Sequence, residues 1–380
     1  MIDKSTFCTR PWNELHIEED GHVTPCCVMP STMGFRPKKG IKNYLNSPEL
    51  AKLKEDLKNG IKSEHCKTCW MQEGYGTHSH RKTTLAKGEK LDKIEAIHVR
   101  STNVCNFKCR ICSPDLSSAW QAENKKHNLY KQKYFQSSIT DIHDNLLDDD
   151  EYCKELFTLL KSVRQINMSG GEPLTCNTTL KFFEKCREYN ITNTNIAINS
   201  NLSKLHYKNH YWLDEFKDFR VTITVSWDGF GKQMEYHRTG LNWKKSLQNF
   251  KESLPFIYNV NCVLSIYSIY SIPKLIHFCD RIQKDLEINL IAGKGGIMCV
   301  QTLPEHEKDK IKKHYENSFS ERPDLKEIAW DKVINPLYKE SGKEYLNTAF
   351  KQYNQILDKQ RGTSFVETFP ELKNWWESIA

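Results

Sequence analysis

The sequence lacks any apolar run that approaches the roughly 18 residues of a membrane-spanning helix. Its opening residues, M-I-D-K-S-T-F-C-T-R-P-W, also lack the hydrophobic core of a secretory signal peptide. We therefore predict a cytoplasmic protein with no membrane partner. In that compartment cysteine thiols remain reduced, so disulfides are not expected to hold the fold together.

A strong excess of charge is absent as well. The 55 basic and 48 acidic residues leave a net charge of +7, which is mild and dispersed along the chain. No basic patch interleaved with aromatic residues is present, so the sequence does not support a nucleic-acid partner. With 380 residues, 38% of them apolar, the chain is long enough for two or three domains and a large core.

Cysteine, in contrast, is abundant. The chain has 14 cysteines, and eight of them fall in tight spacings before residue 113. In a reducing compartment this clustering is typical of metal or iron–sulfur ligands and not of a disulfide framework.

The tightest spacing is C-x3-C-x2-C, formed by Cys105, Cys109 and Cys112. Three thiolates on one short loop can hold three corners of a 4Fe–4S cluster and leave the fourth iron open to another ligand. The spacing alone also allows three ordinary thiols, or a zinc site that is completed by a residue elsewhere.

The first ninety residues indicate a second metal module. Alternating apolar residues around Asp20-Gly21 predict a hairpin, and Ser47-Pro48 opens a predicted helix over 47–59. The pair His78 and His80 is interpreted as solvated loop. Four thiols flank these elements and suit either structural zinc or a fully ligated 4Fe–4S cluster. They are Cys8, one of Cys26 and Cys27, Cys66 and Cys69.

From residue 94 onward, strand patterns alternate with helix patterns, which predicts parallel strands joined by right-handed crossovers. Six strands suggest an α/β fold with an incomplete, open-sided (β/α)6 barrel. The expected domains are a small α+β module at 1–92, the barrel at 93–302 and a helical extension at 303–380. The predicted strands are 94–101, 165–169, 195–199, 221–226, 261–267 and 287–292.

The chemistry of such a barrel lies at the carboxyl ends of its strands. The first strand leads into the three-cysteine loop, and the second ends in Gly170-Gly171-Glu172-Pro173. The third ends in Asn199 and Ser200, and the fourth ends at Ser226 with Arg238 following it. Taken singly, these residues also suit an ordinary glycine turn, helix capping and a surface ion pair.

Together these motifs resemble the radical S-adenosylmethionine superfamily over residues 94–300. The resemblance implies that Cys105, Cys109 and Cys112 hold a 4Fe–4S cluster whose open iron binds S-adenosylmethionine. It places Ile111 near the adenine and assigns the methionine amino group to Gly170, Gly171 and Glu172. It assigns the ribose to Asn199, Ser200 or Ser226, and the methionine carboxylate to Arg238.

The N-terminal region resembles the auxiliary-cluster module called twitch, or half-SPASM. Cys8, Gly21-x4-Cys26 and Cys66-x2-Cys69 match its ligand order, which selects Cys26 over Cys27. The family usually places this module after the barrel, whereas here it comes before. The resemblance implies a second 4Fe–4S cluster that serves electron transfer or structure.

The function implied is that of an enzyme of oxidoreductase or transferase-like character. It would cleave S-adenosylmethionine reductively to a 5′-deoxyadenosyl radical, which abstracts hydrogen from a peptide or small-molecule substrate. A flavodoxin or ferredoxin would supply the electron. The alternative is a zinc-containing nucleic-acid-binding protein with an inactive barrel.

Overall fold

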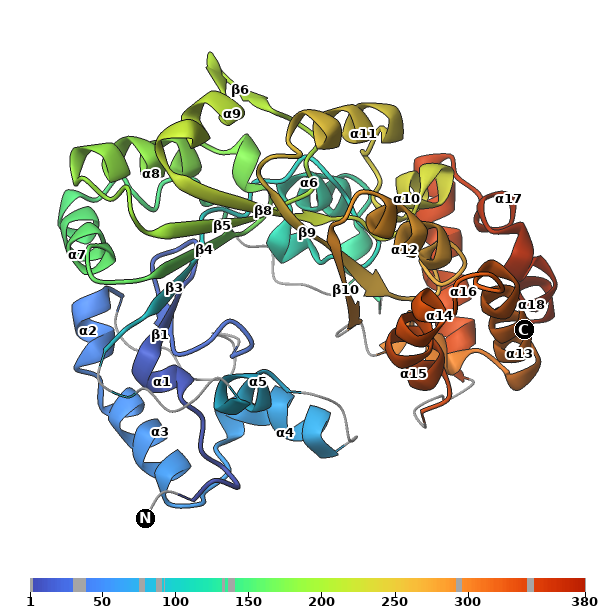
Figure 1. Cartoon of the computed structure of the whole chain (residues 1–380), viewed down its shortest axis with the longest axis horizontal. Coiled ribbons are helices and arrows are strands. Elements are labelled where there is room, and N and C mark those ends of the chain that lie inside the picture. The colour runs from blue at the N-terminus through green and yellow to red at the C-terminus, as the bar shows by residue number, and fades with distance from the viewer. Residues whose placement is uncertain are drawn as a thin grey trace. The chain divides into compact units, whose positions relative to one another are not determined.

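The computed structural model describes residues 3–29, 39–74, 79–86, 91, 93–131, 134–135, 141–291, 296–339 and 345–379 (Figure 1). The chain forms two compact units. The first unit comprises Met1–Val104, Asp141–Asn199 and His206–Thr222. The second unit comprises Cys105–Thr140, Ser200–Leu205 and Ile223–Ala380.

Six strands follow the predicted parallel pattern. Strand β3 pairs with β4, β4 with β5, β8 with β9, and β9 with β10, all in parallel. The sheet order is β10-β9-β8-β5-β4-β3-β1-β2, and both β5 and β8 begin in the first unit and end in the second. The six strands are β3 (Ala96–Arg100), β4 (Gln165–Ser169), β5 (Asn195–Ser200), β8 (Arg220–Ser226), β9 (Ile257–Leu264) and β10 (Asp285–Leu290).

Amphipathic helices separate these strands. In α7 (Asp150–Leu160) the side chain of Asp149 accepts a hydrogen bond from the backbone N–H of Tyr152 at 3.0 Å, which caps the helix. Its apolar stripe is buried, and Phe157 contacts Phe182 of α8 (Asn177–Glu188) with ring centroids 5.6 Å apart. The remaining helices of this series are α6 (Ser118–Lys126), α10 (Gly231–His237), α11 (Trp243–Glu252) and α12 (Ile272–Arg281). The short elements between β5 and β8 are β6 (His206–Tyr207), β7 (His210–Tyr211) and α9 (Trp212–Glu215).

The predicted hairpin is present in the first unit. Strand β1 (Glu14–Ile17) pairs antiparallel with β2 (Val23–Thr24), and Gly21 adopts φ +84° in the turn. Strand β1 also pairs in parallel with β3, which places Leu15 opposite Ile97. The hairpin therefore extends the parallel sheet, a relationship that the sequence pattern did not predict.

The helices of the N-terminal region surround this hairpin. Ser47 caps α3 (Pro48–Lys58) by accepting a hydrogen bond from Leu50 N–H at 3.2 Å, as the sequence predicts. Leu50 and its two partners on the apolar stripe of α3 are at most 2% exposed. The other helices here are α1 (Arg10–Asn13), α2 (Ile41–Leu45), α4 (Lys67–Gly74) and α5 (His80–Ala86).

The C-terminal extension is helical and belongs to the second unit. Trp375 and Trp376 are 2% and 8% exposed, and the ring of Phe365 stacks on Trp376 at 4.4 Å. These residues therefore pack in a core. The helices are α13 (Glu305–Ser318), α14 (Pro323–Ala329), α15 (Asn335–Leu337), α16 (Tyr345–Arg361), α17 (Phe365–Thr368) and α18 (Lys373–Ser378).

The predicted fold class is confirmed: six parallel strands alternate with helices, a small α+β segment precedes them and helices follow. No helix among the described residues has both the length and the apolar character required to cross a membrane.

Candidate metal centres

The three-cysteine loop is anchored on one side by α6. The backbone N–H of Cys105 donates to the Ser118 hydroxyl at 3.1 Å, and the Trp120 indole N–H donates to the carbonyl of Cys109 at 2.9 Å. The Ser117 hydroxyl donates to the carbonyl of Phe107 at 2.6 Å. Because Trp120 is fully buried, these contacts fix the loop against a packed surface.

The other side of the loop contacts the turn that follows α10. Lys108 N–H donates to the carbonyl of Thr239 at 2.8 Å, and Arg110 N–H donates to the carbonyl of His237 at 2.9 Å. Gly240 has φ +111°, and a Cβ atom there would lie 3.0 Å from the carbonyl oxygen of Asn106. Glycine thus allows the turn to approach the loop closely.

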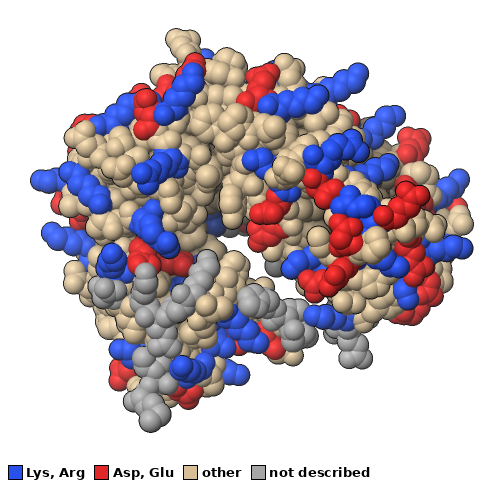
Figure 2. All heavy atoms as spheres, in the orientation of Figure 1, with Lys and Arg blue, Asp and Glu red and all other residues tan. Residues whose placement is uncertain are grey.

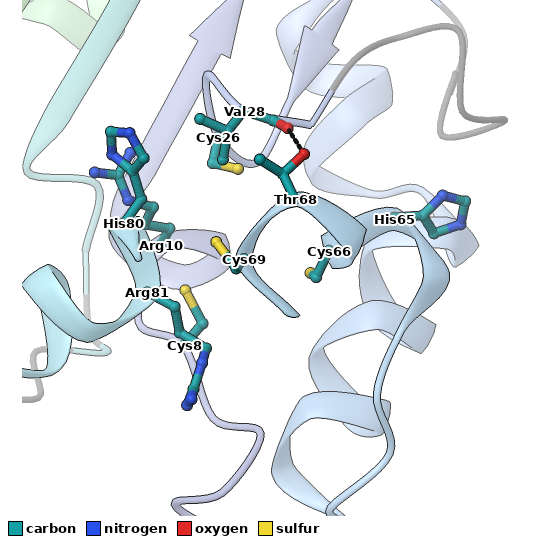
Figure 3. Close-up of a pocket in the computed structure, with 10 residues that line it drawn as sticks. All are labelled: Cys8, Arg10, Cys26, Val28, His65, Cys66, Thr68, Cys69, His80 and Arg81. Atoms are coloured by element: carbon teal, nitrogen blue, oxygen red, sulfur yellow. Dashed lines mark hydrogen bonds between the residues drawn. The ribbon is translucent and has the colours of Figure 1, made fainter. Parts of the chain in front are cut away.

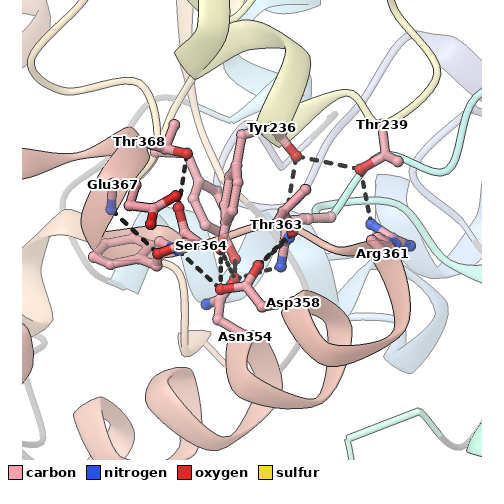
Figure 4. A network of polar contacts seen from close by, with 12 residues as sticks. Tyr236, Thr239, Asn354, Asp358, Arg361, Thr363, Ser364, Glu367 and Thr368 are labelled. Carbon is pink, nitrogen blue, oxygen red and sulfur yellow. Dashed lines mark hydrogen bonds and ion pairs between the residues drawn. The ribbon is translucent and has the colours of Figure 1, made fainter.

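Arg110, between two of the predicted ligands, has a fully buried side chain. Its guanidinium donates to Asn354 Oδ1 at 2.9 Å, Asp358 Oδ1 at 2.7 Å and Thr363 Oγ1 at 2.9 Å. It also lies 3.6 Å from the centroid of the Tyr236 ring. Figure 4 shows the polar network around Asp358 at the end of α16.

Arg361, the last residue of α16, makes a second connection to this region. It pairs with Glu123 of α6 at 2.6 Å. It also donates to the Thr239 hydroxyl at 3.0 Å (Figure 4). Helix α16 therefore contacts both segments that hold the cysteine loop, which are α6 and the turn after α10. These residues were not predicted from the sequence, where the one available signal was an arginine between two ligand positions.

The thiol of Cys109 lies in a strongly desolvated environment. Burial raises its pKa to about 12, and the positive charge of Arg238 opposes that rise. Because a thiol must lose its proton to bind iron, metal binding at this loop releases protons.

The Gly-Gly-Glu segment belongs to the first unit and packs on the chain that leads to Cys105. Gly171 N–H donates to the carbonyl of Thr102 at 2.6 Å, and Glu172 N–H donates to that of Val104 at 2.8 Å. A Cβ atom on Gly171 would lie only 2.2 Å from the Val104 oxygen, so this position has no room for a side chain. Glu172 is 1% exposed, and its carboxylate accepts the N–H of Leu174 at 3.1 Å.

The remaining predicted residues lie near strand ends. The hydroxyl of Ser200 is buried and accepts the N–H of Leu202 at 2.9 Å, whereas Asn199 is exposed. Arg238 donates through Nε to the buried carboxylate of Asp228 at 2.7 Å, a partner that the sequence analysis missed. The first unit contains Gly170, Gly171, Glu172 and Asn199. The second unit contains Cys105, Cys109, Ile111, Cys112, Ser200, Ser226 and Arg238.

The four predicted N-terminal ligands border one pocket in the first unit (Figure 3). Cys8 precedes α1, Cys26 follows β2, Cys66 ends a short 3-10 turn, and Cys69 lies on α4. Cys27 does not line the pocket; its sulfur accepts a hydrogen bond from Arg10 at 3.8 Å. Exposed His80 also borders the pocket, whereas His78 lies outside the described residues. The other lining residues are Arg10, Val28, His65, Thr68 and Arg81.

The arrangement of these four thiols bears on whether they bind a single metal ion or an iron–sulfur cluster. Among the described residues, no three Cys, His, Asp or Glu side chains are placed to hold a single metal ion. The four thiols that border the pocket match in number the ligands of a fully ligated 4Fe–4S cluster.

Comparison with known proteins agrees with this assignment. Residues 8–70 match the SPASM family, which is described as an iron–sulfur cluster-binding domain. No curated protein matches the sequence.

Solved structures match over most of this chain and over 60% to 71% of their own length. One is native anSMEcpe with bound AdoMet and Cp18Cys peptide, with 16% identity, a TM-score of 0.35 and coverage of 71% of this chain and 67% of that one. Another is Streptococcus suis SuiB bound to precursor peptide SuiA, with 12% identity, a TM-score of 0.40 and coverage of 72% and 60%. A third is SuiB bound to S-adenosylmethionine, with 13% identity, a TM-score of 0.37 and coverage of 85% and 71%.

Residues 8–70 thus correspond to an iron–sulfur module of the SPASM type. This match confirms the predicted resemblance of the N-terminal region to a SPASM-type iron–sulfur module.

Proposed function

We propose that this protein is a radical S-adenosylmethionine enzyme of oxidoreductase character. The observation that supports this most is the construction of the three-cysteine loop. Two segments anchor it, and Arg110 is buried within it. The Gly-Gly-Glu turn is hydrogen-bonded to the residues directly before Cys105. When bound, a 4Fe–4S cluster supplies the electron that cleaves S-adenosylmethionine to methionine and a 5′-deoxyadenosyl radical.

The chain's own residues bind and orient the reactants in this proposal. Cys105, Cys109 and Cys112 hold three irons as thiolates. Backbone groups of the Gly170-Gly171 turn and the carboxylate of Glu172 receive the methionine amino group. The glycines suit this role because backbone without a Cβ can approach a ligand closely.

The other reactant contacts are assigned to strand ends. Arg238 receives the methionine carboxylate through guanidinium nitrogens other than Nε, because Asp228 already accepts from Nε and fixes the plane of the group. Asn199, Ser200 and Ser226 receive the ribose, and Ile111 packs near the adenine.

We assign the N-terminal cluster to Cys8, Cys26, Cys66 and Cys69, with a role in electron transfer or in structure. A flavodoxin or ferredoxin supplies the external electron. The substrate is a peptide or a small molecule. Basic and acidic side chains are interspersed on the face seen in Figure 2, so we do not propose a nucleic-acid substrate.

The test is anaerobic reconstitution followed by reduction with S-adenosylmethionine present. We expect about eight irons per chain by the two-cluster count and release of 5′-deoxyadenosine. Cys105→Ala should abolish the release and retain about four irons in the N-terminal module. Cys153→Ala, at a buried cysteine of α7 outside both sites, serves as the control. Release of 5′-deoxyadenosine by Cys105→Ala would rule the proposal out.

A further inference from the structure

Arg10 occupies an unusual position beside the N-terminal cysteines. It is 8% exposed and borders the same pocket as the four predicted ligands (Figure 3). One terminal nitrogen pairs with Glu14 at 2.8 Å and also donates to the sulfur of Cys27 at 3.8 Å. Its Nε is buried and has no hydrogen-bond partner within the part of the chain that the structure describes.

Arg81 borders the same pocket and provides an internal comparison. It is 6% exposed, but its donors are engaged by protein groups. Its Nε donates to Glu73 Oε1 at 2.9 Å, a terminal nitrogen donates to the carbonyl of Phe7 at 3.0 Å, and the other pairs with Glu73. The two arginines therefore differ in one respect that matters here, which is the free Nε–H of Arg10.

A buried donor without a partner is rare, because leaving it unmet is costly. At this pocket the missing acceptor has an evident chemical class. A 4Fe–4S cluster with four thiolate ligands is negatively charged, and its sulfurs accept hydrogen bonds. A donor aimed at those sulfurs stabilises the reduced form more than the oxidised form, because reduction adds negative charge to the cluster.

We propose that Arg10 donates a hydrogen bond from Nε to a sulfur of the SPASM-type cluster and thereby raises the reduction potential of that cluster. The proposal rests on the iron–sulfur assignment of residues 8–70 and not on cleavage of S-adenosylmethionine. Glu14 pairs with a terminal nitrogen of the guanidinium, so Arg10 is held as a fixed donor at the border of the pocket.

The test isolates the N-terminal cluster by replacing Cys105, Cys109 and Cys112 with alanine. Redox titration followed by electron paramagnetic resonance then gives its midpoint potential. Arg10→Lys and Arg81→Lys both keep the positive charge, but only the first removes a donor that lacks a protein partner. We expect a lower midpoint in Arg10→Lys and an unchanged one in Arg81→Lys. Equal midpoints in Arg10→Lys and its parent would overturn the proposal.

A second measurement covers the case in which Arg10→Lys does not assemble a cluster. Pulsed electron paramagnetic resonance on the reduced parent protein, labelled with ¹⁵N-arginine, should reveal a coupled arginine nitrogen. The coupling should persist in Arg81→Lys. Its absence, or zinc in place of iron in the parent protein, would overturn the proposal. Release of 5′-deoxyadenosine by the wild-type protein tests the enzymatic function separately.

Discussion

Arg110 and Asp358 form an ion pair with 2.7 Å between a guanidinium nitrogen and a carboxylate oxygen. The pair joins the middle of the three-cysteine motif to helix α16, 248 residues further along the chain. Asn354 and Thr363 engage the same guanidinium at 2.9 Å each. The C-terminal extension is therefore part of the framework that holds the three cysteines.

Breaking this pair should destabilise the protein. In Asp358→Asn the charge of Arg110 stays buried without its counter-charge, which costs on the order of 3 kcal/mol in the free energy of unfolding. Urea denaturation of the anaerobically purified protein measures this loss. We also expect the iron content to fall, because the loop between Cys109 and Cys112 loses its anchor.

The matched control is an arginine–aspartate pair on the surface of the same unit. Arg322 and Asp280 lie 2.9 Å apart, and their side chains are 41% and 38% exposed. Such pairs contribute about 0–1 kcal/mol, so Asp280→Asn should shift the unfolding midpoint little. Equal losses of unfolding free energy in Asp358→Asn and Asp280→Asn would show that the burial of Arg110 does not strengthen its ion pair.

Gly171 is predicted to be intolerant of any side chain. In Gly171→Ala the new Cβ would meet the backbone oxygen of Val104 at 2.2 Å, and neither group can rotate away. The Gly-Gly-Glu turn must then move away from the strand that leads to Cys105. A displacement of about 1 Å would lower 5′-deoxyadenosine release on the order of 100-fold. Single-turnover release of 5′-deoxyadenosine, quantified by chromatography, is the readout.

Gly74→Ala is the control for that substitution, because a Cβ at Gly74 has no heavy atom within 4 Å. Full release by Gly74→Ala together with full release by Gly171→Ala would contradict the assigned role of the turn. Iron content should stay at the wild-type value in both variants, which separates displaced S-adenosylmethionine from a lost cluster.

The local features of this fold were predictable from the sequence because they depend on neighbouring residues. Alternation of apolar residues gave β4 with its observed bounds, and the Asp20-Gly21 signal located the hairpin correctly. Strand β9 begins at Ile257, four residues before the predicted start at Asn261. Pro255 lies in the turn directly before Ile257, and this turn signal was not used to place the start of the strand.

Long-range relationships were not predictable in the same way. The parallel pairing of β1 with β3 joins segments about eighty residues apart, and nothing in either segment specifies the other. The same holds for Arg110 and Asp358, since a charged residue on a helix is usually solvated. Only the folded chain shows that the Arg110 guanidinium is buried and which groups pair with its charge.

Cys26 and Cys27 should respond differently to replacement by serine. Cys26 borders the pocket with the other predicted ligands, whereas the sulfur of Cys27 contacts Arg10 outside that set. We expect Cys26→Ser to lose the N-terminal cluster, which is about four irons per chain, and Cys27→Ser to retain it. Iron analysis and the visible absorbance of the cluster report the outcome in the variant that also lacks Cys105, Cys109 and Cys112. Iron loss confined to Cys27→Ser would reverse the ligand assignment.

Acidification should destabilise the protein through His237. Burial lowers the pKa of this imidazole from 6.5 to about 4, with Arg238 and Arg110 assisting and Asp228 opposing the shift. The unfolded chain therefore binds the proton between pH 6.5 and 4, while the folded chain does not. The contribution of this group to the free energy of unfolding is complete above pH 6.5 and decreases as the pH is lowered. At pH 5 the loss is about 2 kcal/mol.

Replacement by an uncharged aromatic residue should remove that dependence. The ring of His237 is fully buried 4.9 Å from the Tyr267 ring, and neither ring nitrogen makes a hydrogen bond within the described residues. His237→Phe therefore keeps the packing and removes the titrating group. We expect the difference in unfolding free energy between pH 7 and pH 5 to shrink by about 2 kcal/mol in this variant. His306→Phe, at a side chain 64% exposed, should retain the wild-type difference. A His237→Phe protein that loses as much stability as the wild type on acidification would place the sensitive group elsewhere.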